Sequence, residues 1–155
     1  MVKKIFYWSP YLGRVATIRA VINSMIGLSN LRKNKCNISI INCYGEWDNQ
    51  TINFKKNNIN KIDIQKKIKF NIASYGFIFS RFIYFTSFFL SYKKLKDLIK
   101  IKQPDYLIVH LLTFIPLFLF SNNEFKTKLI LRISGKPNLN FFRSFLWKMS
   151  NKNIN

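Results

Sequence analysis

Short apolar runs alternate with segments of helical periodicity along the chain. Four apolar runs predict β-strands, at residues 3–9, 37–44, 105–110 and 128–134. Apolar side chains at helical spacing predict helices at residues 14–33, 75–101, 113–120 and 138–149. Uniformly apolar strands that alternate with helices indicate a parallel sheet covered on both faces. The pattern therefore predicts an α/β fold, a Rossmann-like doubly wound parallel sheet with helices on both faces.

Two of the predicted helices carry a distinct stripe. On the helix at 75–101 the stripe is polar and consists of Ser80, Tyr84, Ser87 and Ser91. A polar stripe on an otherwise apolar helix favours packing against protein over exposure to lipid, and Pro104 is expected to end this helix. On the helix at 138–149 the stripe is apolar and consists of Leu139, Phe142, Leu146 and Met149.

The region from residue 45 to residue 72 is polar and rich in Asn and Lys. It is expected to hold one or two short strands and much loop. The best strand candidate is "TINF" at residues 51–54.

The chain is strongly basic, with 26 Lys and Arg against six Asp and Glu among 155 residues, a net charge of +20. Such a charge suggests nucleic acid or an anionic membrane surface as a partner. The lysines are scattered, however, and Lys, Asn, Ile, Phe and Tyr dominate throughout, as under an AT-rich coding bias. No helix-turn-helix, RNP-like or zinc-finger signature is visible. We therefore rank coding bias with a mildly membrane-seeking face above nucleic-acid binding.

The cysteines and the histidine indicate neither a disulfide nor a metal site. Cys36 and Cys43 flank a predicted strand, and seven residues of extended chain span roughly 23 Å, which excludes a local disulfide. Two Cys and one His, unclustered, also argue against a metal. A reducing cytoplasm fits, and the short apolar run at the start reads as a first strand and not as a signal peptide.

Two segments approach the character of membrane spans. Residues 76–92 are long enough but include Arg81, and the apolar run 106–120 is shorter than the ~20 residues of a span and includes Pro116. A small two-span membrane protein is therefore the second-ranked alternative.

Polar groups follow three of the predicted strands. In open parallel sheets, ligands bind outside the carboxyl ends of the strands, where the strand order reverses. With the common order, in which the first strand lies beside the later ones, all three ends would line one cleft. The groups expected there are Ser9 and Gly13 after the first strand, His110 and Thr113 after the third, and Arg132, Ser134 and Gly135 at the last.

These groups differ in how strongly they indicate a ligand. Gly13 before a helix offers backbone N–H groups to an anion, although a lone glycine in a turn is usually only a turn. His110 at a strand end is more often structural than catalytic. Arg132 in a buried strand requires an anionic partner. A ligand phosphate fits, and the alternatives are a pair with Asp105 or Glu124, or exposure to solvent.

Three segments together resemble a known family: "SPYLGRVATIRAVINS", "PDYLIVHLLTFIPL" and "TKLILRISGKPNLNFFRSFLWK". In order and spacing they resemble the N-terminal domain of retaining glycosyltransferases of the GT-B fold, of the family-four type. The resemblance implies that residues 1–150 form a Rossmann-like acceptor-binding domain, incomplete at its C-terminal end and followed by a polar tail at 151–155. It also implies that the donor-binding C-terminal domain is absent.

The resemblance implies roles for single residues. The loop with Gly13 and Arg14 would approach the donor phosphate and the acceptor. His110, as the catalytic candidate, and Arg132, Ser134 and Gly135 would reach the transferring sugar. The chain departs from the family in lacking a second glycine in the first loop and in reading "RISG" where many relatives have a histidine. The family's pair of glutamates spaced by seven residues is also missing, since the only glutamates are Glu46 and Glu124.

The expected function is that of the acceptor-binding half of a glycosyltransferase. Its reaction would be retaining transfer from a nucleotide-diphosphate sugar to a cell-envelope polysaccharide, lipopolysaccharide or lipid-linked acceptor, without cofactor or metal. The chain alone is expected to be inactive. It would be cytoplasmic, with the inner face of the plasma membrane as an expected anionic surface. A further alternative is a non-catalytic binding partner of a separately encoded donor half.

Overall fold

The computed structural model describes residues 2–9, 17–32, 35–43, 45–48, 54–64, 77–110, 114–122, 125–133 and 140–150. The strands in these ranges are β1 (Lys3–Trp8), β2 (Cys36–Asn42), β3 (Ile59–Asp63), β4 (Tyr106–Val109) and β5 (Lys128–Leu131). The helices are α1 (Thr17–Leu31), α2 (Phe77–Lys102), α3 (Phe114–Phe120) and α4 (Phe141–Ser150), with a 3₁₀ turn, η1 (Lys55–Asn57).

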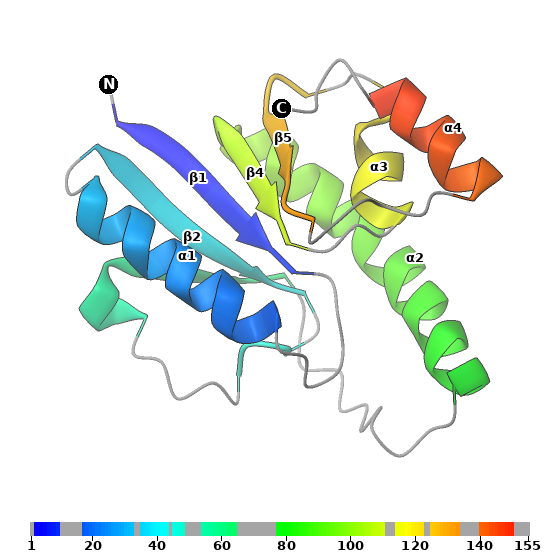
Figure 1. The fold of residues 1–155 in the computed structure, drawn as a ribbon, viewed down its shortest axis with the longest axis horizontal. Coiled ribbons are helices and arrows are strands. Elements are labelled where there is room, and N and C mark those ends of the chain that lie inside the picture. Colours follow the sequence, from blue (N-terminus) through cyan, green and yellow to red (C-terminus); the bar gives the residue numbers. More distant parts are fainter. Residues whose placement is uncertain are drawn as a thin grey trace.

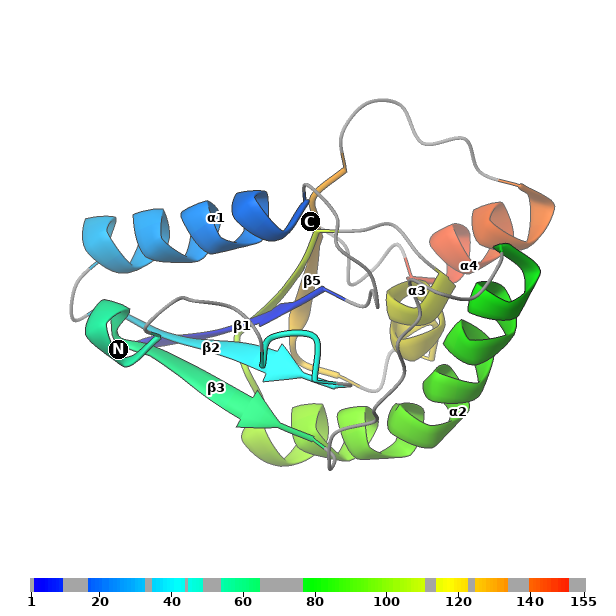
Figure 2. The same cartoon turned by 90° about the horizontal axis from the view of Figure 1, so that it is seen from below.

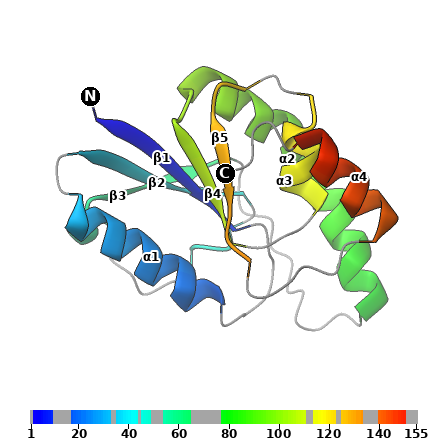
Figure 3. The same ribbon diagram turned by 45° about the horizontal axis from the view of Figure 1, so that its top comes forward.

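The strands form one sheet in the order β3-β2-β1-β4-β5, and all neighbouring pairs are parallel (Figures 1 and 3). The first strand lies in the middle, beside β4. This arrangement confirms the predicted Rossmann-like α/β fold and the predicted position of the first strand next to the later ones.

Helices cover both faces of the sheet, as Figure 2 shows with α1 on one side and α2 on the other. Successive side chains of a strand point to opposite faces. On β1, Ile5 and Tyr7 therefore pack with Val21 and Met25 of α1. The alternate residues of the strand join a second cluster, which comprises Phe6 and Trp8 of β1, Leu95 and Ile99 of α2, Ile115 and Leu119 of α3, and Leu107 and Leu129 of β4 and β5.

A charged contact joins β1 to β4 at the amino ends of the strands. Asp105 accepts hydrogen bonds from the Lys3 Nζ atom at 2.9 Å and from the Lys4 backbone N–H at 2.8 Å. The bond from Lys3, together with that from Lys4, lowers the pKa of the Asp105 carboxyl. The ion pair is partly exposed and adds little to stability, but its backbone bond fixes the position of β4 relative to β1.

The short strand of the polar region lies later than predicted. Phe54, the end of the "TINF" candidate, lies in a turn before η1, and residues 51–53 are outside the described ranges. Asn58 has a left-handed backbone (φ 54°) and leads into β3. The strand was missed because it lies at the edge of the sheet and buries only Ile59, so its sequence, "INKID", shows no apolar run.

The last two strands are less buried than their sequences predict. Tyr106 and Ile108 of β4 and Ile130 of β5 are half-buried, whereas Leu107, Val109 and Leu129 are fully buried. The buried set faces α2 and α3. Strand β5 also ends at Leu131, so the prediction of a buried strand through residue 134 was wrong.

The helix at the C-terminal end of the described chain packs differently from its sequence pattern. Of its apolar stripe, Leu146 is buried, Phe142 and Met149 are exposed, and Leu139 lies outside the described residues. Helix α4 packs against α3 (Figure 1). A helix that packs on another helix buries a narrower strip than one laid on a sheet.

Of the two segments weighed as membrane spans, residues 77–92 lie within the single helix α2. The run 106–120 contains the strand β4 and the seven-residue helix α3, so it is not one helix. Helix α2 ends where Gln103 adopts a left-handed backbone just before Pro104, as predicted. Among the described residues, no helix has the length and apolar character needed to cross a membrane.

The central strands should dominate stability. Replacing fully buried Leu107 on β4 by Ala should lower the free energy of unfolding by about 2–5 kcal/mol, because it leaves a cavity between the sheet, α2 and α3. The same change at Leu31, which is 83% exposed at the end of α1, should alter it by less than about 0.5 kcal/mol. Urea unfolding followed by circular dichroism measures both, and equal losses would contradict the described core.

Candidate functional site

The candidate site lies where the winding of the sheet reverses. From β1 the chain adds β2 and then β3 on one side of the sheet. It then returns and adds β4 on the other side of β1. Trp8, the last residue of β1, pairs with Val109, the last residue of β4. The next residues, Ser9 and His110, therefore follow neighbouring strands at the carboxyl edge. This is the position at which open α/β sheets bind ligands.

Both residues place an unpaired polar atom in the interior. Ser9 is fully buried, and His110 is 5% exposed. Neither the Ser9 Oγ atom nor the His110 Nε2 atom has a hydrogen-bond partner within the described part of the chain. Buried polar atoms are nearly always paired, so two such atoms on adjacent strand ends indicate a place for an outside partner.

His110 is electrically neutral at physiological pH. Burial, as the larger cause, and the positive charge of Arg132, as the smaller one, together lower the pKa of its imidazole from 6.5 to about 4. The ring lies beside Tyr7, with 5.8 Å between the two ring centroids. A neutral imidazole can both accept and donate a hydrogen bond, which suits it to a neutral polar ligand.

Arg132 lies next to this pair but outside the sheet. Its backbone N–H donates to the Val109 carbonyl at 2.8 Å, which holds it at the end of β4. The residue is exposed, so its predicted place inside a buried strand was wrong. Asp105 is bonded to Lys3 and Lys4 at the opposite edge and is not its partner. Glu124, the other partner considered, lies outside the described residues. The side chain of Arg132 is exposed to solvent, one of the alternatives left open by the sequence.

The structure therefore brings Ser9, His110 and Arg132 to three adjacent strand ends. Five further predicted site residues lie outside the described ranges, namely Gly13, Arg14, Thr113, Ser134 and Gly135.

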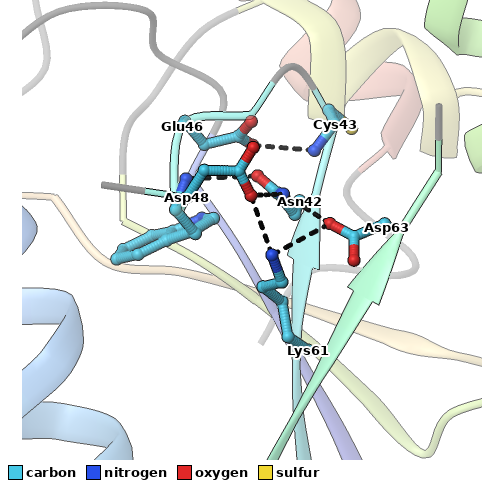
Figure 4. A network of polar contacts seen from close by, with 7 residues as sticks. Asn42, Cys43, Glu46, Asp48, Lys61 and Asp63 are labelled. Atoms are coloured by element: carbon cyan, nitrogen blue, oxygen red, sulfur yellow. Dashed lines mark hydrogen bonds and ion pairs between the residues drawn. The ribbon is translucent and has the colours of Figure 1, made fainter. Parts of the chain in front are cut away.

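A second polar cluster, after β2 and β3, was not predicted from the sequence (Figure 4). Asn42, which is buried, donates from its Nδ2 atom to Asp48, at 3.0 Å, and to Asp63. Its Oδ1 atom accepts the Trp47 backbone N–H at 3.1 Å. One amide thus ties the turn after β2 to the end of β3.

Lysine and glutamate complete this cluster. Lys61 Nζ lies 2.8 Å from Asp48 Oδ1 and 3.3 Å from Asp63 Oδ1, and the bond to Asp48 raises the pKa of the lysine. Glu46 accepts the Cys43 backbone N–H at 3.0 Å. The sequence signal was present, since three of the six acids lie at these strand ends: Glu46 and Asp48 follow β2, and Asp63 is the last residue of β3. Because its polar groups bond to one another, we interpret the cluster as support for the loop.

Metal-binding groups do not gather in the described ranges, where no three His, Cys, Asp or Glu side chains lie together. Cys36 and Cys43 are both free thiols. The pKa of the Cys43 thiol is raised well above its usual value, mainly by burial and to a lesser extent by the negative charge of Glu46. That thiol is therefore a core side chain and not a nucleophile.

Comparison with known proteins identifies the fold. No protein-family model and no curated protein matches the sequence. Among solved structures, UGT73P12 of Glycyrrhiza uralensis, complexed with glycyrrhetinic acid 3-O-monoglucuronide, superposes with a TM-score of 0.59 at 11% identity, covering 88% of this chain and 29% of that one. UDP-GlcNAc 2-epimerase of Neisseria meningitidis, bound to UDP-GlcNAc, gives 0.51 at 15% identity, covering 96% and 39%.

These likenesses establish a Rossmann-like α/β domain of the kind found in GT-B proteins. The chain spans well under half the length of either structure, 29% and 39%. At such identities the likeness concerns the fold alone.

The titration of His110 tests the burial of the site directly. Because the chain has one histidine, its imidazole proton signals are assigned without ambiguity by NMR. We expect a midpoint near pH 4. A midpoint between pH 6 and 7 would mean that the ring is solvated and the site is open to water.

The protonation of His110 should also make the free energy of unfolding depend on pH. Between pH 6.5 and about pH 4 the imidazole is protonated in the unfolded chain but not in the folded one. The free energy of unfolding should therefore fall as the pH decreases through this range. The contribution reaches at most about 1.4 kcal/mol per pH unit. In His110→Gln this contribution should vanish, while that of the carboxylates remains.

Proposed function

We propose that this chain is the acceptor-binding, Rossmann-like half of a GT-B glycosyltransferase. The reaction is transfer of a sugar from a nucleotide-diphosphate sugar to a cell-envelope glycan or lipid-linked acceptor. The observation that carries the proposal is the pair of unpaired buried atoms, Ser9 Oγ and His110 Nε2, at the reversal point of the sheet. The fold likeness to a glycoside-bound protein and a UDP-GlcNAc-bound protein supports it.

The chemistry of the pair suits a sugar hydroxyl. A hydroxyl donates one hydrogen bond and accepts others, and so does the serine side chain. The neutral imidazole accepts a hydrogen bond without introducing a charge, because its pKa lies near 4. A carboxylate ligand would instead favour a protonated histidine. The pair is therefore assigned to the acceptor or to the sugar being transferred.

Arg132 suits the anionic part of the donor. A guanidinium binds phosphate oxygens through two parallel hydrogen bonds and stays charged at all relevant pH values. Its exposure at the end of β5 leaves it accessible to a diphosphate. The proposal thus divides the site between a neutral part at Ser9 and His110 and a cationic part at Arg132.

The resemblance to family-four-type retaining enzymes supplies the finer assignment. It implies a second Rossmann-like domain that holds the nucleotide-sugar, with no metal in the reaction. Donor and acceptor must be held together in reacting geometry, and one wall of a cleft does not provide that proximity. Transfer is accordingly assigned to the pair of domains.

Arg132 should contribute to nucleotide-sugar binding in the chain alone. We expect uridine- or guanosine-diphosphate sugars to shift the His110 NMR signal with weak, millimolar-range affinity. Arg132→Ala should weaken this binding roughly tenfold, as expected for loss of a charge-assisted contact. Arg32→Ala, an equal charge change on an exposed arginine after α1, is the matched control and should bind as the unmodified chain does. If both variants bound the nucleotide-sugar equally weakly, the loss would be due to net charge and not to a contact with Arg132.

The chain alone should catalyse no transfer. A radiolabelled nucleotide-sugar incubated with the purified chain and membrane extract should yield no labelled product, because the donor is not held against the acceptor. Micromolar donor binding or measurable turnover by this chain would refute the half-enzyme proposal.

A further inference from the structure

The buried ring of Tyr7 lies against His110 from the neighbouring strand. Tyr7 pairs with Ile40 of β2 on one side and with Ile108 of β4 on the other. Side chains two residues apart along a strand point to the same face, so His110 projects to the face on which Ile108 and Tyr7 lie. The centroids of the tyrosine and histidine rings are 5.8 Å apart, and the ring planes are inclined by 33°.

Tyr7 is held at both ends of its side chain. Its backbone belongs to the central strand β1, and its hydroxyl lies 3.1 Å from the Ser24 Oγ atom of α1, within hydrogen-bond distance. Its ring belongs to the same buried cluster as Val21 and Met25 of α1. Burial raises the pKa of the hydroxyl, which therefore keeps its proton. The ring cannot change its rotamer without losing these contacts.

The imidazole of His110 is not fixed in this way at its Nε2 atom. That atom has no hydrogen-bond partner in the part of the chain that the structure describes. The torsion that turns an imidazole about its Cβ–Cγ bond is broad, so the orientation of the ring depends on what packs against it. Tyr7 is the aromatic ring in contact with it, at a separation at which tilted aromatic pairs attract each other.

The charge of Arg132 acts on both rings. It adds to the effect of burial in lowering the pKa of His110, and it opposes the effect of burial that raises the pKa of Tyr7. An electrostatic effect on both groups places the guanidinium near each of them. Tyr7 thus belongs with His110 and Arg132 at the carboxyl edge of the sheet.

We propose that Tyr7 is a positioning residue for His110: its ring, anchored to α1 through Ser24, holds the imidazole in the orientation that presents Nε2 to the ligand. Without the ring, the imidazole would turn about its Cβ–Cγ bond and water would reach it. The inference rests on the proposed function, which makes His110 a ligand-binding group. The orientation of the imidazole is nevertheless a property of the chain without ligand, so its test does not depend on whether a nucleotide-sugar binds.

NMR of the ligand-free chain with ¹⁵N-labelled histidine tests the proposal. The one histidine gives one set of ring signals, and their ¹⁵N shifts report which ring nitrogen carries the proton. In the unmodified chain and in Tyr7→Phe, which keeps the ring, we expect one dominant tautomer and a titration midpoint near pH 4. In Tyr7→Leu we expect both tautomers and a midpoint higher by about one pH unit or more, because the imidazole is turned and solvated.

The matched control is Phe6→Leu. Phe6 precedes Tyr7 on β1 and is also buried, but it faces α2, so its loss removes a similar ring from the opposite face of the sheet. It should leave the tautomer and the midpoint of His110 unchanged. The proposal is wrong if folded Tyr7→Leu leaves both unchanged, or if Phe6→Leu alters them equally.

A second variant decides the matter if Tyr7→Leu does not fold. Ser24→Ala alters a half-buried residue of α1 and leaves the buried Tyr7 hydroxyl without this partner. We expect the tautomer ratio and the midpoint of His110 to change in the same direction as in Tyr7→Leu, by a smaller amount. Unaltered His110 signals in Ser24→Ala would then overturn the proposal.

Discussion

The position of β1 between β2 and β4 is the constraint on which the rest of the structure depends. The strand is hydrogen-bonded along both edges and packed on both faces, with residues Ile5 through Trp8 buried. From this strand the chain winds first toward β3 and then, after the return, toward β5. Because the winding reverses here, the segments after β1 and β4 leave the sheet from neighbouring positions, and Ser9 and His110 come together.

Two polar clusters at the same edge of the sheet differ in how their groups are satisfied. Around Asn42, the amide, two aspartates, Lys61 and a backbone N–H bond to one another, which fixes the turn after β2. At Ser9 and His110 the buried atoms have no such partners in the described residues. A closed network stabilises a loop, whereas an open pair has hydrogen bonds to offer a ligand. We therefore interpret the Asn42 cluster as support for the loop, and Ser9 with His110 as the candidate site.

Prediction from the sequence succeeded for buried strands and failed where burial is partial. The apolar runs of β1 and β2 are visible because both faces of the sheet are covered there, and those of β4 and β5 remain visible although one face of each is only half-buried. Edge strand β3 buries little, and its sequence shows no run to detect. The same reasoning placed Arg132 within a buried strand, yet β5 ends at Leu131, one residue before it, and the side chain of Arg132 is exposed. The end of a strand depends on its neighbours in the sheet, which a single sequence does not specify.

The sequence by itself determined the class of fold and the candidate residues at the strand ends, because hydrophobic periodicity reflects which faces are covered. It did not determine which candidates would be buried without partners. The neutral state of His110 arises from desolvation and from the charge of Arg132, contributed by a strand adjacent to β4 in space. The exposure of α4 arises from its packing on α3 and not on the sheet. Both depend on contacts between distant segments, so only the tertiary structure decided them.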